Sequence, residues 1–180
     1  MSTIPLLQYP NPRLRNKAKP VSSVHAPEIQ KIIYDMLETL AQTENCAALA
    51  ATQLDLLNPP AITVINNPDP NSSLAPLCLI NPQIVEASGE CTDVEGCMSV
   101  YPDQIKGKVK RAQKIKVKAL NQKGQLLEIE AEDFLARCLQ HEIDHLQGII
   151  YLDHLSPLKR KLVEKKISHL KNLAKKKVDI

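Results

Sequence analysis

Two histidines with a glutamate beside one of them are the residues of this sequence best suited to chemistry. His141, Glu142 and His145 lie in residues 139–146 (LQHEIDHL), which contain the HExxH pattern. On a helix, side chains four positions apart share a face, so both imidazoles can bind one metal ion. Glu142 can then accept a proton from a water molecule that attacks a substrate. The bare pattern also arises by chance on solvent-exposed helices, so its surroundings must decide.

The neighbouring residues favour a buried site. The sides of the expected helix are apolar at Phe134, Leu135, Cys138, Leu139 and Leu146. Buried histidines and carboxylates need partners, and a cation supplies one. We therefore expect a metal-binding helix at about residues 133–146, which ends near Gly148 because glycine commonly terminates helices.

A catalytic metal site needs a third protein ligand and an open coordination position. Cys97, within residues 95–99 (EGCMS), is the candidate ligand. Residues 46–53 (CAALAATQ), 95–99 and 140–145 (QHEIDH) resemble, in this order, the GxGLAAxQ, EGCLS and QHExDH motifs of the peptide deformylase family. The resemblance extends over nearly the whole chain, from about residue 11 to residue 159.

The resemblance implies a metal-dependent hydrolase that removes the N-formyl group from the N-terminal formylmethionine of newly made polypeptides and releases formate. It implies one divalent metal ion bound by Cys97, His141 and His145. Fe²⁺ is the expected native metal, and Zn²⁺ or Ni²⁺ is expected in protein purified in air. Formylated nascent peptides are the expected partners.

The resemblance also implies roles for residues around the metal. Glu142 is expected to take a proton from the attacking water molecule and deliver it to the departing amine. The side-chain amide of Gln53 and the backbone N–H of Met98 are expected to stabilise the oxyanion. Substrate binding is assigned to Ala48, Gly96, Phe134, Arg137 and Cys138. The methionine side chain is expected to enter a pocket, and the peptide is expected to lie extended near residue 48 and to pair there like an added strand.

Two residues of the first motif leave alternatives open. Cys46 and Ala48 stand where the family has glycines, and an alanine forced to a positive φ costs roughly 1 kcal/mol or more. One alternative is therefore a deformylase-like protein with altered or lost activity. Another is a metallopeptidase, since HExxH recurs in zinc proteases. Cys97 as the third ligand and the loop around Gln53 count against the peptidase.

Composition indicates a single domain, residues 1–180, whose core is aliphatic. The chain has 180 residues, of which 43% are hydrophobic and only 3% aromatic. No signal peptide pattern and no apolar run long enough to cross a bilayer is apparent, so we expect a cytoplasmic protein without a membrane partner. Five cysteines, odd in number and without CxxC, argue against a disulfide scaffold.

The pattern of apolar residues predicts an α+β fold, with antiparallel or mixed sheets packed around the central metal-binding HExxH helix. The first twenty residues are expected to form an extended arm, followed by a helix at about residues 27–43. Residues 44–53 and 66–76 are expected to be loops. Strands are expected at residues 61–65, 77–80, 84–87, 115–120 and 126–129.

A C-terminal amphipathic helix is expected at about residues 156–177, with an apolar stripe from Leu158 and Leu162 to Leu173. Residues 159–177 hold nine Lys or Arg and one Glu, a net charge of +8, whereas the rest of the chain carries −5. Such segregation favours a polyanionic partner, which by resemblance is the ribosome, without sequence-specific nucleic-acid binding. The alternative is that the lysines only solvate the helix.

Overall fold

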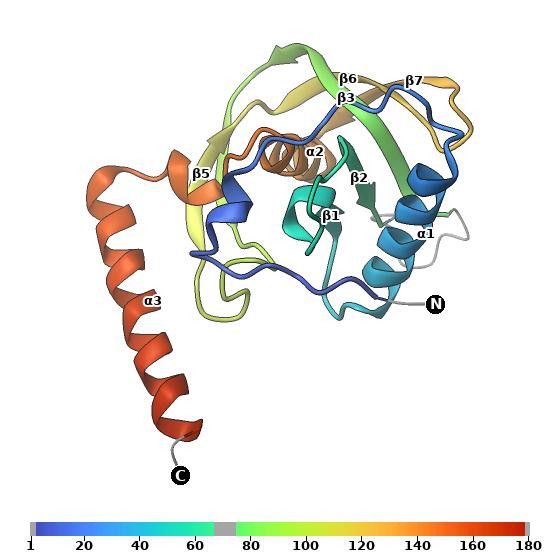
Figure 1. Ribbon diagram of the computed structural model, residues 1–180. Coiled ribbons are helices and arrows are strands. Elements are labelled where there is room, and N and C mark those ends of the chain that lie inside the picture. The colour runs from blue at the N-terminus through green and yellow to red at the C-terminus, as the bar shows by residue number, and fades with distance from the viewer. Residues whose placement is uncertain (1–2, 67–74, 179–180) are drawn as a thin grey trace.

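The computed structural model describes residues 3–66 and 75–178 and contains two antiparallel sheets (Figure 1). The larger sheet has five strands in the order β1-β2-β3-β6-β7, and β4 pairs only with β5. The strands are β1 (Ala48–Ala50), β2 (Ile62–Ile65), β3 (Leu77–Ser88), β4 (Cys91–Glu95), β5 (Gly107–Arg111), β6 (Lys114–Leu120) and β7 (Leu126–Glu132). The expectation of an α+β fold with antiparallel sheets is confirmed.

Three α-helices and three short 3₁₀ helices complete the fold. They are η1 (Pro12–Arg15), α1 (Pro27–Gln42), η2 (Ala51–Gln53), α2 (Asp133–Leu146), η3 (Tyr151–His154) and α3 (Pro157–Val178). The three helices predicted from apolar spacing agree with α1, α2 and α3 to within one residue at each end. Among the helices described, none is long and apolar enough to cross a membrane.

Several predicted strand boundaries were wrong. The strands expected at residues 77–80 and 84–87 are one strand, β3, which continues through Asn81 with a register shift between Ile80 and Gln83. Asn81 has φ 51° and its side chain binds both the N–H and the C=O of Val21, each at 2.8 Å. These tertiary hydrogen bonds stabilise the strand at a position where the local sequence predicts that the strand is interrupted.

Other elements were missing from the sequence interpretation. The stretch 44–53 was expected to be a loop but contains β1 and η2. Strands β4 and β5 were not predicted, because most of their side chains are polar or exposed and leave only a weak apolar alternation. The expected loop at 66–76 falls mainly in residues 67–74, outside the described residues.

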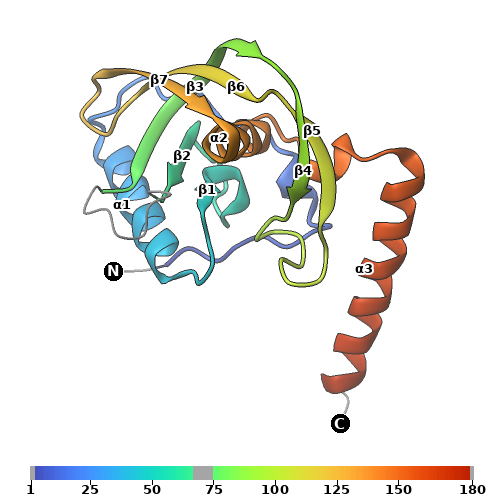
Figure 2. The same ribbon diagram turned by 180° about the vertical axis from the view of Figure 1, so that it is seen from behind.

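Helix α2 packs against the large sheet on one side and faces β4 and β5 on the other (Figure 2). Ala136 and Leu139 are fully buried and belong to one apolar cluster with Leu79 and Val117 of the sheet. The helix ends at Leu146, and Gly148, two residues later, has φ +74°; a Cβ there would lie 2.3 Å from the carbonyl oxygen of Arg15. Only glycine therefore fits where the chain leaves α2.

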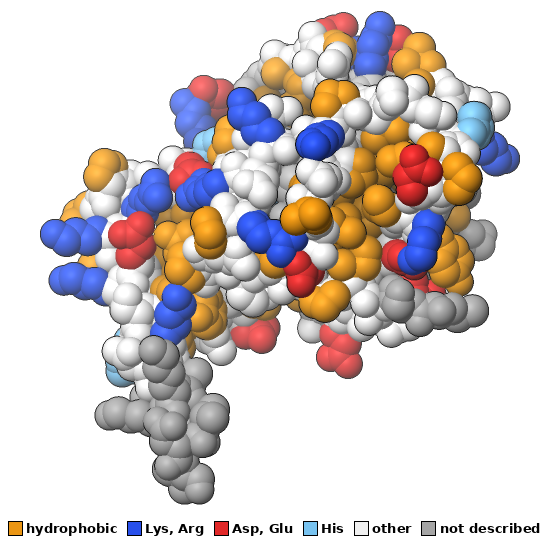
Figure 3. Space-filling view, in the orientation of Figure 1, with side chains coloured by type: hydrophobic (Ala, Val, Ile, Leu, Met, Phe, Trp, Pro, Cys, Tyr) orange, Lys and Arg blue, Asp and Glu red, His pale blue; other side chains and the backbone are white. Residues whose placement is uncertain are grey.

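Helix α3 extends away from the body and touches it through a narrow apolar face (Figure 3). Ile167 is 3% exposed and packs in one cluster with Val100 and Ile105, which lie just after the EGCMS motif. Leu158 and Leu162, expected in the apolar stripe, are exposed, and the side chain of Leu173 lies outside the described residues. Lys and Arg side chains cover much of the visible surface of α3.

Candidate metal centre and active site

The side chains of Cys97, His141 and His145 converge at the buried face of α2. The sulfur of Cys97 lies 3.2 Å from Nε2 of His145, which lies 3.1 Å from Nε2 of His141. One donor atom from each residue lies within 4.8 Å of the others, and all three side chains are buried. The helix supplies both histidines, while the turn after β4 supplies the cysteine.

The chemistry of these donors fits a small divalent cation. Two Nε2 atoms that face each other must either share a proton or share a positively charged partner. Burial, together with the charges of His141 and Arg111, holds the pKa of His145 well below its usual value, so this imidazole is neutral near pH 7. If a metal ion replaced the proton between the rings, a thiolate and two neutral imidazoles would form a common ligand set for zinc and related metals.

Glu95 orients one of these imidazoles and was given no role in the sequence interpretation. Its carboxylate is 5% exposed and lies 3.0 Å from Nδ1 of His141, so that Nε2 of the same ring is left to face the cluster. Arg111 donates to both Glu95 oxygens at 3.0 and 3.1 Å, and Arg137 donates to one at 2.8 Å. Burial alone would raise the pKa of Glu95, but His141 and Arg111 hold it well below its usual range.

The hydrogen-bonded groups continue outward from Glu95 to the surface. Arg111 also donates to Asp144, and Asp144 lies 2.7 Å from Nε2 of His154. The position of Glu95 in the EGCMS motif, two residues before Cys97, was the one sequence signal for its role. Nothing in the sequence indicated a role for Arg111, because it lies in a lysine-rich segment, residues 106–114 (KGKVKRAQK), that is typical of an exposed surface.

Glu142 lies beside the three donor atoms in an apolar setting. It is 3% exposed, and its Oε2 has no hydrogen-bond partner among the residues described. Burial raises the pKa of Glu142 to about 7, while the charge of His141 opposes that rise. A carboxyl group whose pKa is about 7, and one of whose oxygens is free of hydrogen bonds, can exchange protons with a water molecule in the cavity.

Gln53 and Met98 supply polar groups on the other side of the cluster. The Nε2 of Gln53 lies 3.4 Å from the Cys97 sulfur and 3.3 Å from the Ser99 hydroxyl. Its Oε1 accepts a hydrogen bond of 2.9 Å from the N–H of Ala50, which fixes the amide orientation. In the described part of the chain, no acceptor is paired with the Met98 N–H.

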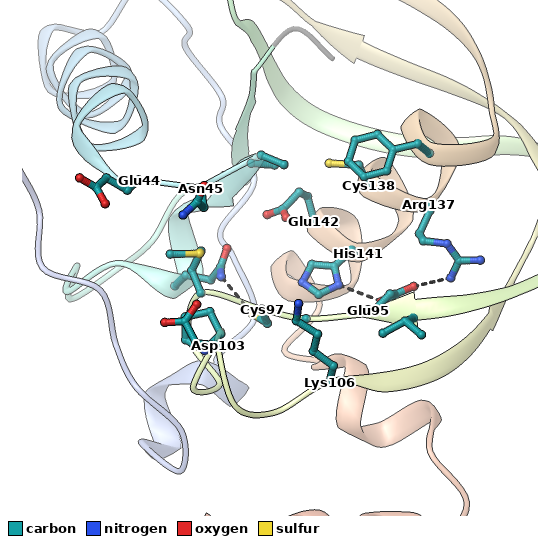
Figure 4. Close-up of a pocket in the computed structure, with 18 residues that line it drawn as sticks. Glu44, Asn45, Glu95, Cys97, Asp103, Lys106, Arg137, Cys138, His141 and Glu142 are labelled. Carbon is teal, nitrogen blue, oxygen red and sulfur yellow. Dashed lines mark hydrogen bonds and ion pairs between the residues drawn. The ribbon is translucent and has the colours of Figure 1, made fainter. Parts of the chain in front are cut away.

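A cavity of about 710 Å³ opens over the cluster (Figure 4). Its walls include Cys97, His141 and Glu142 together with the other residues predicted to bind substrate or the oxyanion: Ala48, Gln53, Gly96, Met98, Phe134, Arg137 and Cys138. His145 lies beneath this surface and is 1% exposed. The fold thus brings three distant motifs to one cavity.

Arg137 and Phe134 contribute to this cavity in different ways. The guanidinium of Arg137 is 6% exposed and binds Glu95 and the carbonyl oxygen of Val109, at 2.8 and 3.0 Å. These bonds hold its charged end against the protein (Figure 4), so that its stem is the part available to a ligand. Phe134 is 60% exposed at the rim and offers an apolar surface.

The first motif carries no backbone strain at the two positions where glycine was expected. The residue with a positive φ in this segment is Asn45, at 55°, and neither Cys46 nor Ala48 has one. Ala48 instead belongs to β1 and pairs with Ile65 of β2. The penalty for an alanine forced to positive φ therefore does not arise, because Asn45, a residue type that tolerates this conformation, makes the turn.

Cys46 is buried rather than reactive. It is 6% exposed, and its sulfur lies 3.2 Å from the carbonyl oxygen of Ala48. Burial raises the pKa of the Cys46 thiol to about 12, and the charge of Glu142 adds to that rise. Since only the thiolate is a strong nucleophile, Cys46 acts as a small packing residue beneath β1.

The chain is similar to known peptide deformylases over most of its length. Residues 3–161 match the family described as polypeptide deformylase. Peptide deformylase 1 of Coxiella burnetii is 51% identical over 170 residues, covering 94% of this chain and 98% of that protein. Peptide deformylase 3 of Shewanella oneidensis is 42% identical and covers 93% of this chain and 98% of its own length.

Solved structures agree with this assignment. A peptide deformylase from Legionella pneumophila superposes with a TM-score of 0.82 at 37% identity, covering 96% of this chain and 98% of that one. A peptide deformylase from Ehrlichia chaffeensis in complex with actinonin gives 0.83 at 35% identity, covering 94% and 98%. The matches of sequence and fold show that this chain belongs to the polypeptide deformylase family.

Proposed function

We propose that this protein hydrolyses the formamide bond at the N-terminus of formylmethionyl polypeptides and releases formate. Family membership supports the reaction class. The observation that carries the proposal is the convergence of the Cys97 sulfur and two imidazole nitrogens beside the buried carboxylate of Glu142. The alternatives of lost activity and peptidase activity gain no support, because the first motif is unstrained and the relatives are deformylases.

Cys97, His141 and His145 would bind one divalent metal ion, with Fe²⁺ as the native ion and Zn²⁺ or Ni²⁺ after exposure to air. When bound, such an ion lowers the pKa of a nearby water molecule toward about 7 and polarises a carbonyl group. The hydrogen bond between Glu95 and Nδ1 of His141 supports this ligand set, because it leaves Nε2 free to coordinate.

The protein's own groups would then manage protons and charge. Glu142 would accept a proton from the attacking water molecule and deliver it to the departing amine. The Gln53 amide and the Met98 N–H would donate hydrogen bonds to the developing oxyanion. The bond from Ala50 to the oxygen of Gln53 supports this role, because it presents the NH₂ end of the amide beside Cys97.

Strand β1 offers an edge to an extended peptide. It lies at one end of the sheet order and pairs on one side only, with β2. A substrate could therefore add to the open side near Ala48, as in other β-strand recognition. The first side chain would enter the cavity beside Gly96, Phe134 and Cys138, with the stem of Arg137 behind it, and later side chains would be read loosely.

The reaction is tested by formate release under anaerobic conditions. We expect Fe²⁺-loaded protein to release formate from a formyl-Met tripeptide, and to leave the acetylated tripeptide and the internal bonds of a blocked peptide intact. Internal cleavage would instead indicate a peptidase. Tight binding of the formyl peptide without turnover, in protein with full metal content, would contradict the proposal. Metal content is measured on the same sample.

We also propose that residues 1–180 form one catalytic domain in the cytoplasm whose basic helix α3 binds the ribosome. In the described part of α3, Lys159, Lys161 and Lys165 are exposed. Ile167 of the same helix packs against Val100 and Ile105 and so joins α3 to the rest of the protein. Replacing these three lysines with glutamine should weaken salt-sensitive binding to ribosomes while leaving Ile167 in place. Unchanged binding would favour the view that the lysines only solvate the helix.

A further inference from the structure

Among the described residues, the side chain of Lys106 extends over the cavity without forming an ion pair. Lys106 lines the same cavity as His141 and Glu142, and Figure 4 shows it reaching from the rim toward His141. Its stem runs along Gly96: a Cβ at Gly96 would lie 3.6 Å from Cγ and 3.8 Å from Cε of Lys106. These are ordinary van der Waals distances, so the stem of Lys106 lies alongside this residue of the EGCMS motif.

The backbone on both sides of Lys106 is held firmly. Ile105 is 1% exposed, its N–H donates to the carbonyl oxygen of Tyr101 at 2.9 Å, and its own carbonyl oxygen accepts from the Tyr151 hydroxyl at 3.2 Å. Gly107 begins β5 so close to Leu155 that a Cβ would lie 2.8 Å from Cδ2 of that residue. The backbone of Lys106 is therefore fixed at the cavity rim, from which its flexible stem carries the ammonium over the cavity.

The charges around the cavity leave this ammonium available. Glu95 is already engaged by two arginines, and the neighbouring Lys110 pairs with Glu90. In the described ranges, Lys106 forms no ion pair with any carboxylate, and Figure 4 shows Glu44 and Asp103 on the other side of the cavity. A bound molecule with a carboxylate near this rim would thus meet an unpaired positive charge.

The chemistry of the substrate indicates what this charge meets. A formylated amino terminus is neutral, so the first charges of the polypeptide are on the side chains that follow formylmethionine. An extended peptide along β1, with its first side chain in the cavity, carries its next residues across the rim. We propose that Lys106 binds an acidic side chain at the second or third substrate residue and thereby favours such substrates; this inference rests on the proposed function.

The test compares acidic and neutral peptides that differ in one side chain. The substrates are formyl-Met-X-Ser and formyl-Met-Ser-X, each with an amidated C-terminus and with Glu or its uncharged analogue Gln at X. For the unmodified protein, we expect kcat/KM to be about 3- to 5-fold higher for Glu than for Gln at one of the two positions, as for a solvent-exposed ion pair, and the ratio to fall at high salt.

Two variants and one control locate the effect. Lys106→Gln should bring the Glu-to-Gln ratio to about 1, and Lys106→Glu should reverse it. Lys108→Gln removes an exposed lysine of β5, two positions after Lys106, that does not line the cavity, and should keep the original ratio. The inference would be overturned if the Glu-to-Gln ratio of kcat/KM were near 1 in the unmodified protein, or if it stayed the same in both Lys106 variants. Formate release in those experiments would still support the proposed function. No formate from any peptide would overturn both.

Discussion

At the scale of single residues, the hydrogen bonds of Glu95 set the ring orientation and the tautomer of His141. A buried carboxylate that receives hydrogen bonds from Arg111, Arg137 and the Nδ1 of His141 fixes both the ring orientation and the tautomer. Such supporting groups commonly matter to metal affinity nearly as much as the ligands themselves. The motif residue before Gly96 is therefore a positioning residue for the proposed metal site.

We predict that Glu95→Gln weakens metal affinity by about 10–100-fold, because Gln cannot hold the imidazole and both arginines in the same way. The free energy of unfolding should also fall by about 3–5 kcal/mol, since a buried charge pair loses one partner. Competition with a chromophoric chelator and urea unfolding measure the two effects. Glu90→Gln, at a carboxylate that is 67% exposed and paired with Lys110, is the control. Reduced stability with unchanged metal affinity would limit Glu95 to a structural role.

Gln53 illustrates how a proposed oxyanion donor also supports the fold. We predict that Gln53→Glu lowers kcat by about 10²–10³-fold, because the NH₂ donor becomes an oxygen while the acceptor for the Ala50 N–H remains. Gln53→Ala should lower kcat similarly and cost about 1–3 kcal/mol of stability, because it leaves that buried N–H unpaired. Steady-state formate release and thermal unfolding separate the two effects. Near-normal turnover in Gln53→Ala would contradict the assignment.

At the scale of elements, η3 connects parts of the chain that are distant in sequence. Asp153 accepts from the Ile150 N–H at 3.0 Å, from Arg15 of η1 at 3.0 Å and from Arg160 of α3 at 3.1 Å. Partial burial would raise the pKa of Asp153, but Arg15 and the Ile150 N–H hold it below its usual value. The carboxylate thus links the N-terminal arm to the start of α3.

This linkage predicts a pH-dependent effect of Asp153→Asn. Because the folded pKa lies below the unfolded one, the charge stabilises the fold above the unfolded pKa of about 3.9, and this contribution is lost as pH falls through the folded value. Asp153→Asn should therefore be less stable near pH 7, and the difference should shrink below about pH 4. Urea unfolding across this range measures it, with Asp55→Asn at an exposed ion pair as the control. A deficit that stays constant in acid would contradict a charge effect.

At the scale of the whole molecule, α3 covers the segment that follows Cys97. Ile167 is a buried residue of α3 in the apolar cluster with Val100 and Ile105, and Val163 and Leu170 pack against this cluster, while Leu162 is 58% exposed. We predict that Ile167→Ala lowers the free energy of unfolding by about 2–5 kcal/mol. Leu162→Ala should change it by no more than about 0.5 kcal/mol. Equal effects of the two substitutions in urea unfolding would contradict this docking of α3.

Apolar periodicity predicted α1 and α2 because each has a buried face that recurs every three or four residues. It predicted α3 because apolar residues recur there at helical spacing, although Leu158 and Leu162 of that stripe are exposed. It failed at β1, β4 and β5 for different reasons. The three residues of β1 are all buried and too few to show a period, whereas β4 and β5 are mostly exposed. That Ala48 avoids a positive φ was also not visible in the sequence, since which residue of a turn takes positive φ depends on the pairing of the whole segment.

The amino-acid sequence by itself determined the helices, the three motifs and the residue types that could bind a metal, because these depend on local spacing and side-chain chemistry. Only the tertiary structure decided that the Cys97 sulfur meets the imidazoles of α2, that Glu95 lies between Arg111, Arg137 and His141, and that Lys106 faces the cavity. Such meetings join residues far apart along the chain, and they depend on strand register and helix packing, which local sequence patterns do not encode.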